Sequence, residues 1–214
     1  MILSGFYTSI ERLGNSLLYR GYDDEGKKIS HRIKYKPTLY LKSKKPVTDW
    51  KALDETPVEP LQFGSMSEVK EFQKSYKGVP DFCLYGNTRH IPAFIQNQFP
   101  NEIVYNRNMV DVASLDIETA YGDGFPEVDN PVNQILTIAY KSSKDDTYRV
   151  WGMKPYDEAI TALKHLKIEY RQFTEESSML SAFIDYWAEP DNTPDIITGW
   201  NTRFFDIPYM VARM

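Results

Sequence analysis

The order of apolar segments in the second half of the chain limits the fold more than any other feature. Three strand-like segments follow one another at 110–119, 135–140 and 148–151, with turn residues between the last two. Helical and strand-like segments then alternate. The expected elements are a helix at 157–166, a strand at 168–173, a helix capped by Thr174 that buries Met179, Leu180, Phe183, Ile184 and Trp187, a strand at 195–198 and a helix from Phe205. This order predicts a mixed α/β sheet covered by helices.

The first half of the chain predicts a β-rich α+β domain. Turn signals at Gly14-Asn15 and at 23–26 separate short apolar runs, and the segment 29–35 alternates as a half-buried strand should. The other expectations are a strand at 39–41, an irregular Pro-containing stretch at 46–64, a helix at 65–76, a short strand at 82–85 and a short helix at 91–99.

Charge divides the chain at the place where the pattern changes. Residues 1–106 hold 15 Lys and Arg against 12 Asp and Glu, a net charge of +3, whereas residues 107–214 hold 10 against 18, a net charge of −8. We therefore expect two domains, 1–106 and 107–214.

The composition excludes several classes of protein. The single cysteine, Cys83, cannot form an internal disulfide, and its apolar neighbours predict a core position. No apolar run approaches the roughly 20 residues of a membrane helix, and charges interrupt the first residues before a signal peptide could form. These features predict a cytoplasmic protein without a membrane partner.

Two carboxylates, Asp116 and Glu118, lie near the end of the first predicted strand of the second half. Side chains in a strand alternate, so both carboxylates project from one face while Leu115 and Ile117 project from the other. Two carboxylates on one face repel each other unless a cation lies between them, and Mg²⁺ prefers oxygen ligands. The pattern therefore suggests a metal site, although acid-x-acid also occurs at ordinary solvated strand ends.

A third carboxylate, Asp206, follows the last predicted strand. It lies among Phe204, Phe205, Ile207 and Tyr209, where an unpaired charge would be costly. Active sites of open α/β sheets lie beyond strand ends, which favours a functional role. The alternative is an aspartate in the first turn of a helix, stabilised by the helix dipole.

Together these segments resemble a known family. Asp116-Ile117-Glu118, followed by Asn201-x-x-x-Phe205-Asp206, is similar to the first two exonuclease motifs of family B DNA polymerases, and most similar to the replicative polymerases of T-even-type phages. The segments 123–127, 198–201 and 205–209 and the N-terminal Tyr35-Lys36-Pro37 also resemble that subgroup. The resemblance covers essentially the whole chain.

The resemblance implies an N-terminal domain followed by the start of a 3′→5′ proofreading exonuclease domain of ribonuclease H-like fold. Asp116, Glu118 and Asp206 would be catalytic metal ligands for two Mg²⁺ or Mn²⁺ ions, and Glu118 would orient the attacking water. Asn201 would be a hydrogen-bonding residue of the site, and Phe125 would pack against the bases of the unwound primer end. The implied partner is a single-stranded DNA 3′ end or a primer–template.

A basic segment in the first half allows two interpretations. Eight Lys and Arg and no acid occur between Lys27 and Lys45, with Tyr35 and Tyr40 among them. This mixture suits a nucleic-acid groove, but lysines also protect ordinary edge strands. The resemblance implies RNA binding and translational repression by this domain. The candidate contacts are Lys27, Lys28, Arg32, Lys34 and Lys36.

The third motif of the family, Tyr-x-x-x-Asp, has no counterpart after Asp206. The one occurrence of that spacing, from Tyr19 to Asp23, precedes the first motif and lies at a turn. With a metal ligand missing, we expect weak or no nuclease activity from this chain alone. The expected protein is the front part of a larger enzyme. The alternatives are a non-catalytic RNA- or DNA-binding module, or one subunit of a split polymerase whose second chain carries the remaining parts.

Overall fold

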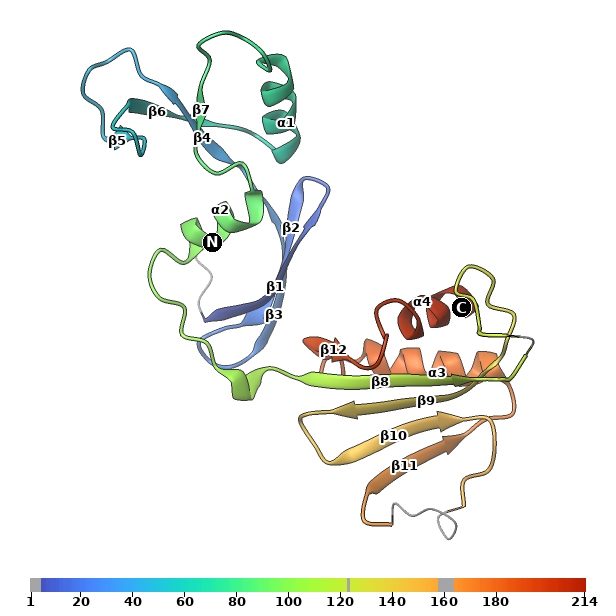
Figure 1. Cartoon of the computed structure of the whole chain (residues 1–214). Coiled ribbons are helices and arrows are strands. Elements are labelled where there is room, and N and C mark those ends of the chain that lie inside the picture. Colours follow the sequence, from blue (N-terminus) through green and yellow to red (C-terminus); the bar gives the residue numbers. More distant parts are fainter. Residues whose placement is uncertain (1–4, 123, 158–163) are drawn as a thin grey trace. The chain divides into compact units, whose positions relative to one another are not determined.

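The chain divides between Met109 and Val110 into two units, each with its own core (Figure 1). The computed structural model describes residues 5–122, 124–157 and 164–214. The described residues include four α-helices and three β-sheets, so the protein is a mixed α+β structure. No described helix has the length and apolar character that a membrane crossing requires.

The first unit begins with a three-stranded antiparallel sheet. Its strands are β1 (Phe6–Leu13), β2 (Ser16–Tyr22) and β3 (Lys28–Lys34), paired in that order. Gly14 turns the chain between β1 and β2 at a φ of +60°, a region that favours glycine. Ile10, Leu17 and Tyr19 form the buried side of this sheet.

A second sheet of the same unit has the order β5-β6-β4-β7. Its strands are β4 (Thr38–Lys42), β5 (Trp50–Lys51), β6 (Pro57–Gln62) and β7 (Leu84–Tyr85), and the helices of this unit are α1 (Met66–Ser75) and α2 (His90–Gln98). Ser65 caps α1 by accepting a hydrogen bond from the Glu68 N–H. Leu39, Phe63 and Val69 form a core between this sheet and α1.

Two expectations for the first unit are wrong. The stretch 46–64 is not irregular, because it contains β5 and β6. Proline is tolerated in β6 because β5 is only two residues long, so Pro60 pairs with Tyr40 on one side and has no β5 partner on the other. Cys83 is exposed rather than buried, because it lies just before the two-residue strand β7 and outside the core.

The second unit is built on one five-stranded sheet with the order β11-β10-β9-β8-β12, and Figure 1 shows these strands side by side. The strands are β8 (Val112–Thr119), β9 (Ile135–Ser142), β10 (Thr147–Gly152), β11 (Lys167–Gln172) and β12 (Ile196–Thr198). β8, β9 and β10 pair antiparallel, whereas β11 lies parallel to β10 and β12 parallel to β8. This is the mixed sheet that the element order predicts.

Two helices, α3 (Glu176–Ala188) and α4 (Asp206–Arg213), share a core with one face of this sheet. α3 begins after Glu175, not Thr174, and its N-cap makes no side-chain hydrogen bond. Met179, Leu180 and Phe183 are buried as expected, but Ile184 is exposed because it lies at the open side of α3, next to α4. The helix expected at 157–166 falls largely outside the described residues.

Candidate active site

Asp116 and Glu118 lie on the open face of β8. Ala113, Leu115 and Ile117 point into the core shared with α3 and α4, so the alternating side chains point the other way, and both carboxylates are exposed. Asp116 pairs with Ala139 and Glu118 with Thr137 of β9, and the register shifts directly after Glu118. The two carboxylates therefore stand at the end of the regular part of the strand, on one face.

The chain that follows β12 covers the remaining edge of β8. β12 pairs only with Val112, Ala113 and Ser114, so the backbone of β8 beyond Ser114 needs other partners. Thr202, which is buried, donates from Oγ1 to the Leu115 carbonyl at 3.4 Å. The Ile117 N–H donates to Asp206 Oδ1 at 3.1 Å. These two contacts fix the first residue of α4 against the strand that carries Asp116.

Asp206 is only 2% exposed, and its two carboxylate oxygens are in different situations. Oδ1 accepts the Ile117 N–H, whereas Oδ2 is buried without a hydrogen-bond partner. Burial raises the pKa of Asp206 above its usual value, and the negative charge of Asp116 raises it further. A buried, unpartnered carboxylate oxygen near a second carboxylate has the donor chemistry that a hard divalent cation requires.

Glu118 does not complete a cluster in the described part of the chain. No group of three or more His, Cys, Asp and Glu side chains in that part is arranged to hold a metal ion. The structure thus brings Asp206 of α4 to Asp116 of β8, while Glu118 shares β8 with Asp116 but is not buried as Asp206 is.

Asn201 shapes the turn between β12 and α4. Its φ is +61°, in the left-handed region that Asn tolerates better than most residues. Its carbonyl accepts hydrogen bonds from the N–H groups of Phe204 and Phe205, both at 2.9 Å. The side chain is exposed. Asn201 is therefore held in the turn by its backbone, while its side chain stays exposed.

Phe125 lies next to the start of α4 although it is far away in the sequence. Its ring centroid is 5.1 Å from that of Phe205, the residue before Asp206, yet the side chain is 77% exposed. Two hydrogen bonds attach the chain after Phe125 to α4. The Tyr209 hydroxyl donates to the Asn133 carbonyl at 2.7 Å, and the Arg213 guanidinium donates to the Pro131 carbonyl at 2.9 Å. A large exposed ring is thus held against Phe205 at the start of α4.

Sequence reasoning missed several residues of this region. Thr202 and Gly199 build the edge contact, and the only signal for them was their place between a strand and Asp206. Trp200 and Phe204 are strongly exposed aromatics in the same turn. Asp111 is a buried acid, but Ser142 and Ser143 donate to its Oδ1, so its role is structural.

The basic residues of the first unit lie on and beside β3. Lys28, Arg32 and Lys34 share one face of this edge strand, and Lys27 and Lys36 flank it. Tyr35, however, is buried in the core, where its ring contacts Phe94, so it is not available for stacking on bases. Tyr40 lies on the other sheet.

Comparison with known proteins places the chain in a family. The sequence model of the DNA polymerase family B exonuclease domain matches residues 91–214, which include all three carboxylates. This chain belongs to DNA polymerase family B. Its exonuclease domain has the ribonuclease H-like fold expected from the sequence, and the resemblance to the phage polymerases is confirmed.

Curated family B members show how far the similarity extends. The DNA-directed DNA polymerase of Enterobacteria phage T4 is 29% identical over 229 residues, which cover 98% of this chain and 25% of the phage protein. That of Escherichia phage RB69 is 27% identical, with the same coverage. The DNA polymerase delta catalytic subunit of Glycine max is 32% identical over 48% of this chain and 9% of its own length. The chain thus spans about a quarter of the phage relatives that it matches.

Proposed function

We propose that the second unit is a 3′→5′ proofreading exonuclease domain that hydrolyses the terminal phosphodiester of single-stranded DNA or of a primer–template. The observation that carries this proposal is the unpartnered Oδ2 of Asp206 beside Asp116, at the edge of β8 in a family B chain. Retaining a buried charge without a partner is costly, so the arrangement favours a bound cation over a purely structural role.

The proposed roles are those that the resemblance to family B polymerases implies, and the positions of the side chains are compatible with them. Asp116, Glu118 and Asp206 would hold two Mg²⁺ or Mn²⁺ ions. Once bound, these ions would stabilise the attacking and leaving oxygens of the phosphodiester. Glu118, exposed on the open face of β8, would orient the water. Phe125 would pack against the unwound bases, because its exposed ring is braced by Phe205. Asn201, whose side chain is exposed, would hydrogen-bond the substrate.

We further infer that the 214-residue chain assayed alone is a weak nuclease. It offers two of the three acidic motifs of the family, and a metal site that lacks a ligand loses affinity and control over the bound water. A second chain with the remaining motif and the polymerase parts would then restore digestion on mixing.

Direct metal binding is the decisive test because it does not depend on the rate of hydrolysis. Mn²⁺ binding should be measurable by electron paramagnetic resonance for the parent chain, and should be lost in Asp116→Ala/Glu118→Ala. The matched control is Asp185→Ala/Glu189→Ala, which removes two exposed acids of the α3 region. Unchanged Mn²⁺ binding in the first double variant would contradict the site.

Digestion of 3′-labelled single-stranded DNA should be followed on the same proteins in Mg²⁺ and in Mn²⁺. Slow or undetectable digestion by the parent is expected. Rapid digestion that disappears in Asp116→Ala/Glu118→Ala would support the site but refute the inference that the chain is incomplete as a nuclease.

A second candidate function is binding of RNA or single-stranded DNA by the first unit. It is favoured by the basic face of β3, whose Lys28, Arg32 and Lys34 lie on an edge strand. Phosphate contacts of this kind are independent of sequence and weaken with salt. The burial of Tyr35 removes base stacking at that residue from this candidate, so the contacts would be electrostatic.

A further inference from the structure

A hollow in the first unit lies on the side of the four-stranded sheet that α1 does not cover. The leucines on one face of this sheet pack in the core with α1, namely Leu39, Leu61 and Leu84. Alternation then directs Tyr40 and Tyr85, which are paired across β4 and β7, to the opposite face. Trp50 of β5 joins them through its pairing with Val58. This sheet therefore has an aromatic face on the side opposite to α1.

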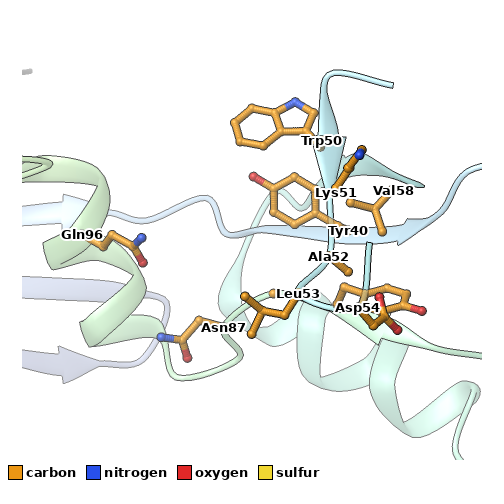
Figure 2. Close-up of a pocket in the computed structure, with 11 residues that line it drawn as sticks. Tyr40, Trp50, Lys51, Ala52, Leu53, Asp54, Val58, Asn87 and Gln96 are labelled. Atoms are coloured by element: carbon orange, nitrogen blue, oxygen red, sulfur yellow. The ribbon is translucent and has the colours of Figure 1, made fainter. Parts of the chain in front are cut away.

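The hollow on that face, here called the Trp50 pocket, has a volume of about 810 Å³, within the range of small-ligand sites. Figure 2 shows Trp50 and Tyr40 on one side of it, and Asn87 and Gln96 on the other. The ring centroids of Tyr40 and Trp50 are 5.4 Å apart, and the Trp50 side chain is 52% exposed. An indole with half of its surface open to solvent inside a hollow offers a free stacking surface.

The polar groups of the Trp50 pocket suit the edge of a planar heteroaromatic ring. Asn87 Oδ1 accepts the Arg89 N–H at 2.9 Å, which fixes this side chain and leaves its NH₂ group to donate elsewhere. The Gln96 amide, on α2, makes no hydrogen bond within the described ranges. Side-chain amides carry both donors and acceptors, and they pair with the edges of nucleobases.

Charge in the Trp50 pocket does not favour an anion as the recognised feature. Lys51 and Asp54 both line it, so their charges oppose each other, and Lys51 also forms an ion pair with Glu55 at 2.8 Å. A ligand held here is therefore expected to be recognised by a neutral ring rather than by a phosphate.

A second hollow of about 490 Å³ lies next to the Trp50 pocket. Trp50 and Val58 line both of them. The two hollows thus adjoin at the Trp50 side chain. Lys45 also lines the second hollow, where it forms an ion pair with Glu59 at 3.5 Å, so this hollow does not favour an anion either.

We propose that the Trp50 pocket binds an unpaired nucleobase, stacked on Trp50 and hydrogen-bonded along its edge by Asn87 and Gln96. The site lies entirely within residues 40–96 and goes beyond the proposed nuclease function, on which it does not depend. The base belongs either to a free nucleotide or to a single strand, and both sources present the same ring.

The test is calorimetric titration of the full chain in EDTA, where metal-dependent hydrolysis cannot interfere. The ligands are the four nucleoside monophosphates, ribose 5-phosphate as the matched compound without a base, and adenosine hexanucleotides of RNA and DNA. We expect the base-containing ligands to bind and ribose 5-phosphate not to bind. Trp50→Ala should weaken binding by about 5- to 100-fold, the effect of losing one stacked base, whereas Trp50→Phe should retain most of it.

Two further variants keep the test independent of folding and of the nuclease site. Gln96→Ala changes one exposed amide and should weaken binding of AMP by about fivefold with an unchanged melting temperature. Trp200→Ala removes another strongly exposed indole, in the second unit, and should leave AMP binding unchanged. Asp116→Ala/Glu118→Ala should also bind AMP as the parent does, so failure of the nuclease proposal would leave this result intact.

The outcomes separate the sources and can overturn the proposal. AMP that binds as tightly as a hexanucleotide assigns the site to a free nucleotide, and binding of hexanucleotides alone, lost in Trp50→Ala, assigns it to a single strand. Equal binding of ribose 5-phosphate and AMP, an unaffected Trp50→Ala variant, or no binding of any base-containing ligand overturns it.

Discussion

Asp206 is the residue on which the proposed metal site of the second unit depends most. Its Oδ1 continues the hydrogen bonding of the β8 edge, and its Oδ2 has no partner. The same residue is therefore structural through one oxygen and available as a ligand through the other. A carboxylate is required for the second role but not for the first, since an amide oxygen also accepts an N–H.

Asp206→Asn separates these two roles. Because burial and Asp116 raise the pKa of Asp206, the folded chain binds its proton more tightly than the unfolded chain does, and stability decreases as the pH rises between the unfolded and the folded pKa. In EDTA at about pH 7 we expect Asp206→Asn to be more stable than the parent by about 1 kcal/mol. The difference should shrink as the pH is lowered toward about 4.

Urea unfolding at several pH values, with and without Mn²⁺, measures this prediction. Mn²⁺ should stabilise the parent but not Asp206→Asn, because a ligand stabilises only the state that binds it. A variant that is less stable than the parent in EDTA at every pH would show that the Asp206 charge is already compensated within the protein.

The sequence predicted where two of the candidate site residues lie on their strand, but not the contacts that surround them. The same-face placement of Asp116 and Glu118 follows from strand period alone, and the structure shows it. That Asp206 meets β8 through the Ile117 N–H could not be predicted, because it depends on β12 being only three residues long. Phe125 was placed by resemblance, and its contact with Phe205 is set by tertiary packing.

At the scale of elements, the sequence predicted the strands that have long apolar runs. It failed for a strand that exists only because it pairs with its neighbours in the sheet. The strands of the second unit were expected within a few residues of their bounds, because their apolar runs are long. β6 was missed because Pro57 and Pro60 signal a loop, and its pairing with β4 and β5 makes it a strand. Trp50, on the short β5 beside it, was therefore not recognised as part of a sheet face.

The turn between β12 and α4 depends on Gly199 for a close approach. A Cβ at this position would lie 2.1 Å from Thr202 Oγ1 and 2.4 Å from the Leu115 carbonyl oxygen. The carbonyl belongs to the backbone of β8, so the turn itself would have to move. We expect Gly199→Ala to lower the free energy of unfolding by about 1–3 kcal/mol and to weaken Mn²⁺ binding through displacement of Asp206.

Gly14→Ala is the matched control for this element. A Cβ at Gly14 meets nothing within 4 Å. The free energy of unfolding of Gly14→Ala should therefore fall only because alanine is less stable than glycine at a positive φ, and the variant should keep the Mn²⁺ affinity of the parent. Chemical unfolding and Mn²⁺ titration of both variants measure the difference. Equal stability and equal Mn²⁺ affinity for Gly199→Ala and the parent would mean that the turn does not position Asp206.

At the scale of the whole molecule, opposite net charges accompany the two units. The half of the sequence before Arg107 carries +3 and the half from Arg107 carries −8, and the structure divides after Met109. An acidic second unit is expected to repel nucleic acid unless cations occupy its carboxylates, whereas a basic first unit is expected to attract it in the absence of divalent metal. Binding without metal should therefore depend on the first unit.

Salt titration tests whether metal-independent binding depends on the first unit. Affinity for an RNA or DNA single strand in EDTA should fall linearly on logarithmic axes as salt rises, because phosphate contacts release counterions. Arg32→Ala/Lys34→Ala/Lys36→Ala should reduce the slope by about 2, at roughly 0.7 for each lost contact. The matched control, Lys70→Ala/Lys74→Ala/Lys77→Ala, removes the same charge from exposed positions on and after α1 and should leave the slope closer to that of the parent. Equal slopes for the two triple variants would show that net charge, rather than the β3 face, attracts the strand.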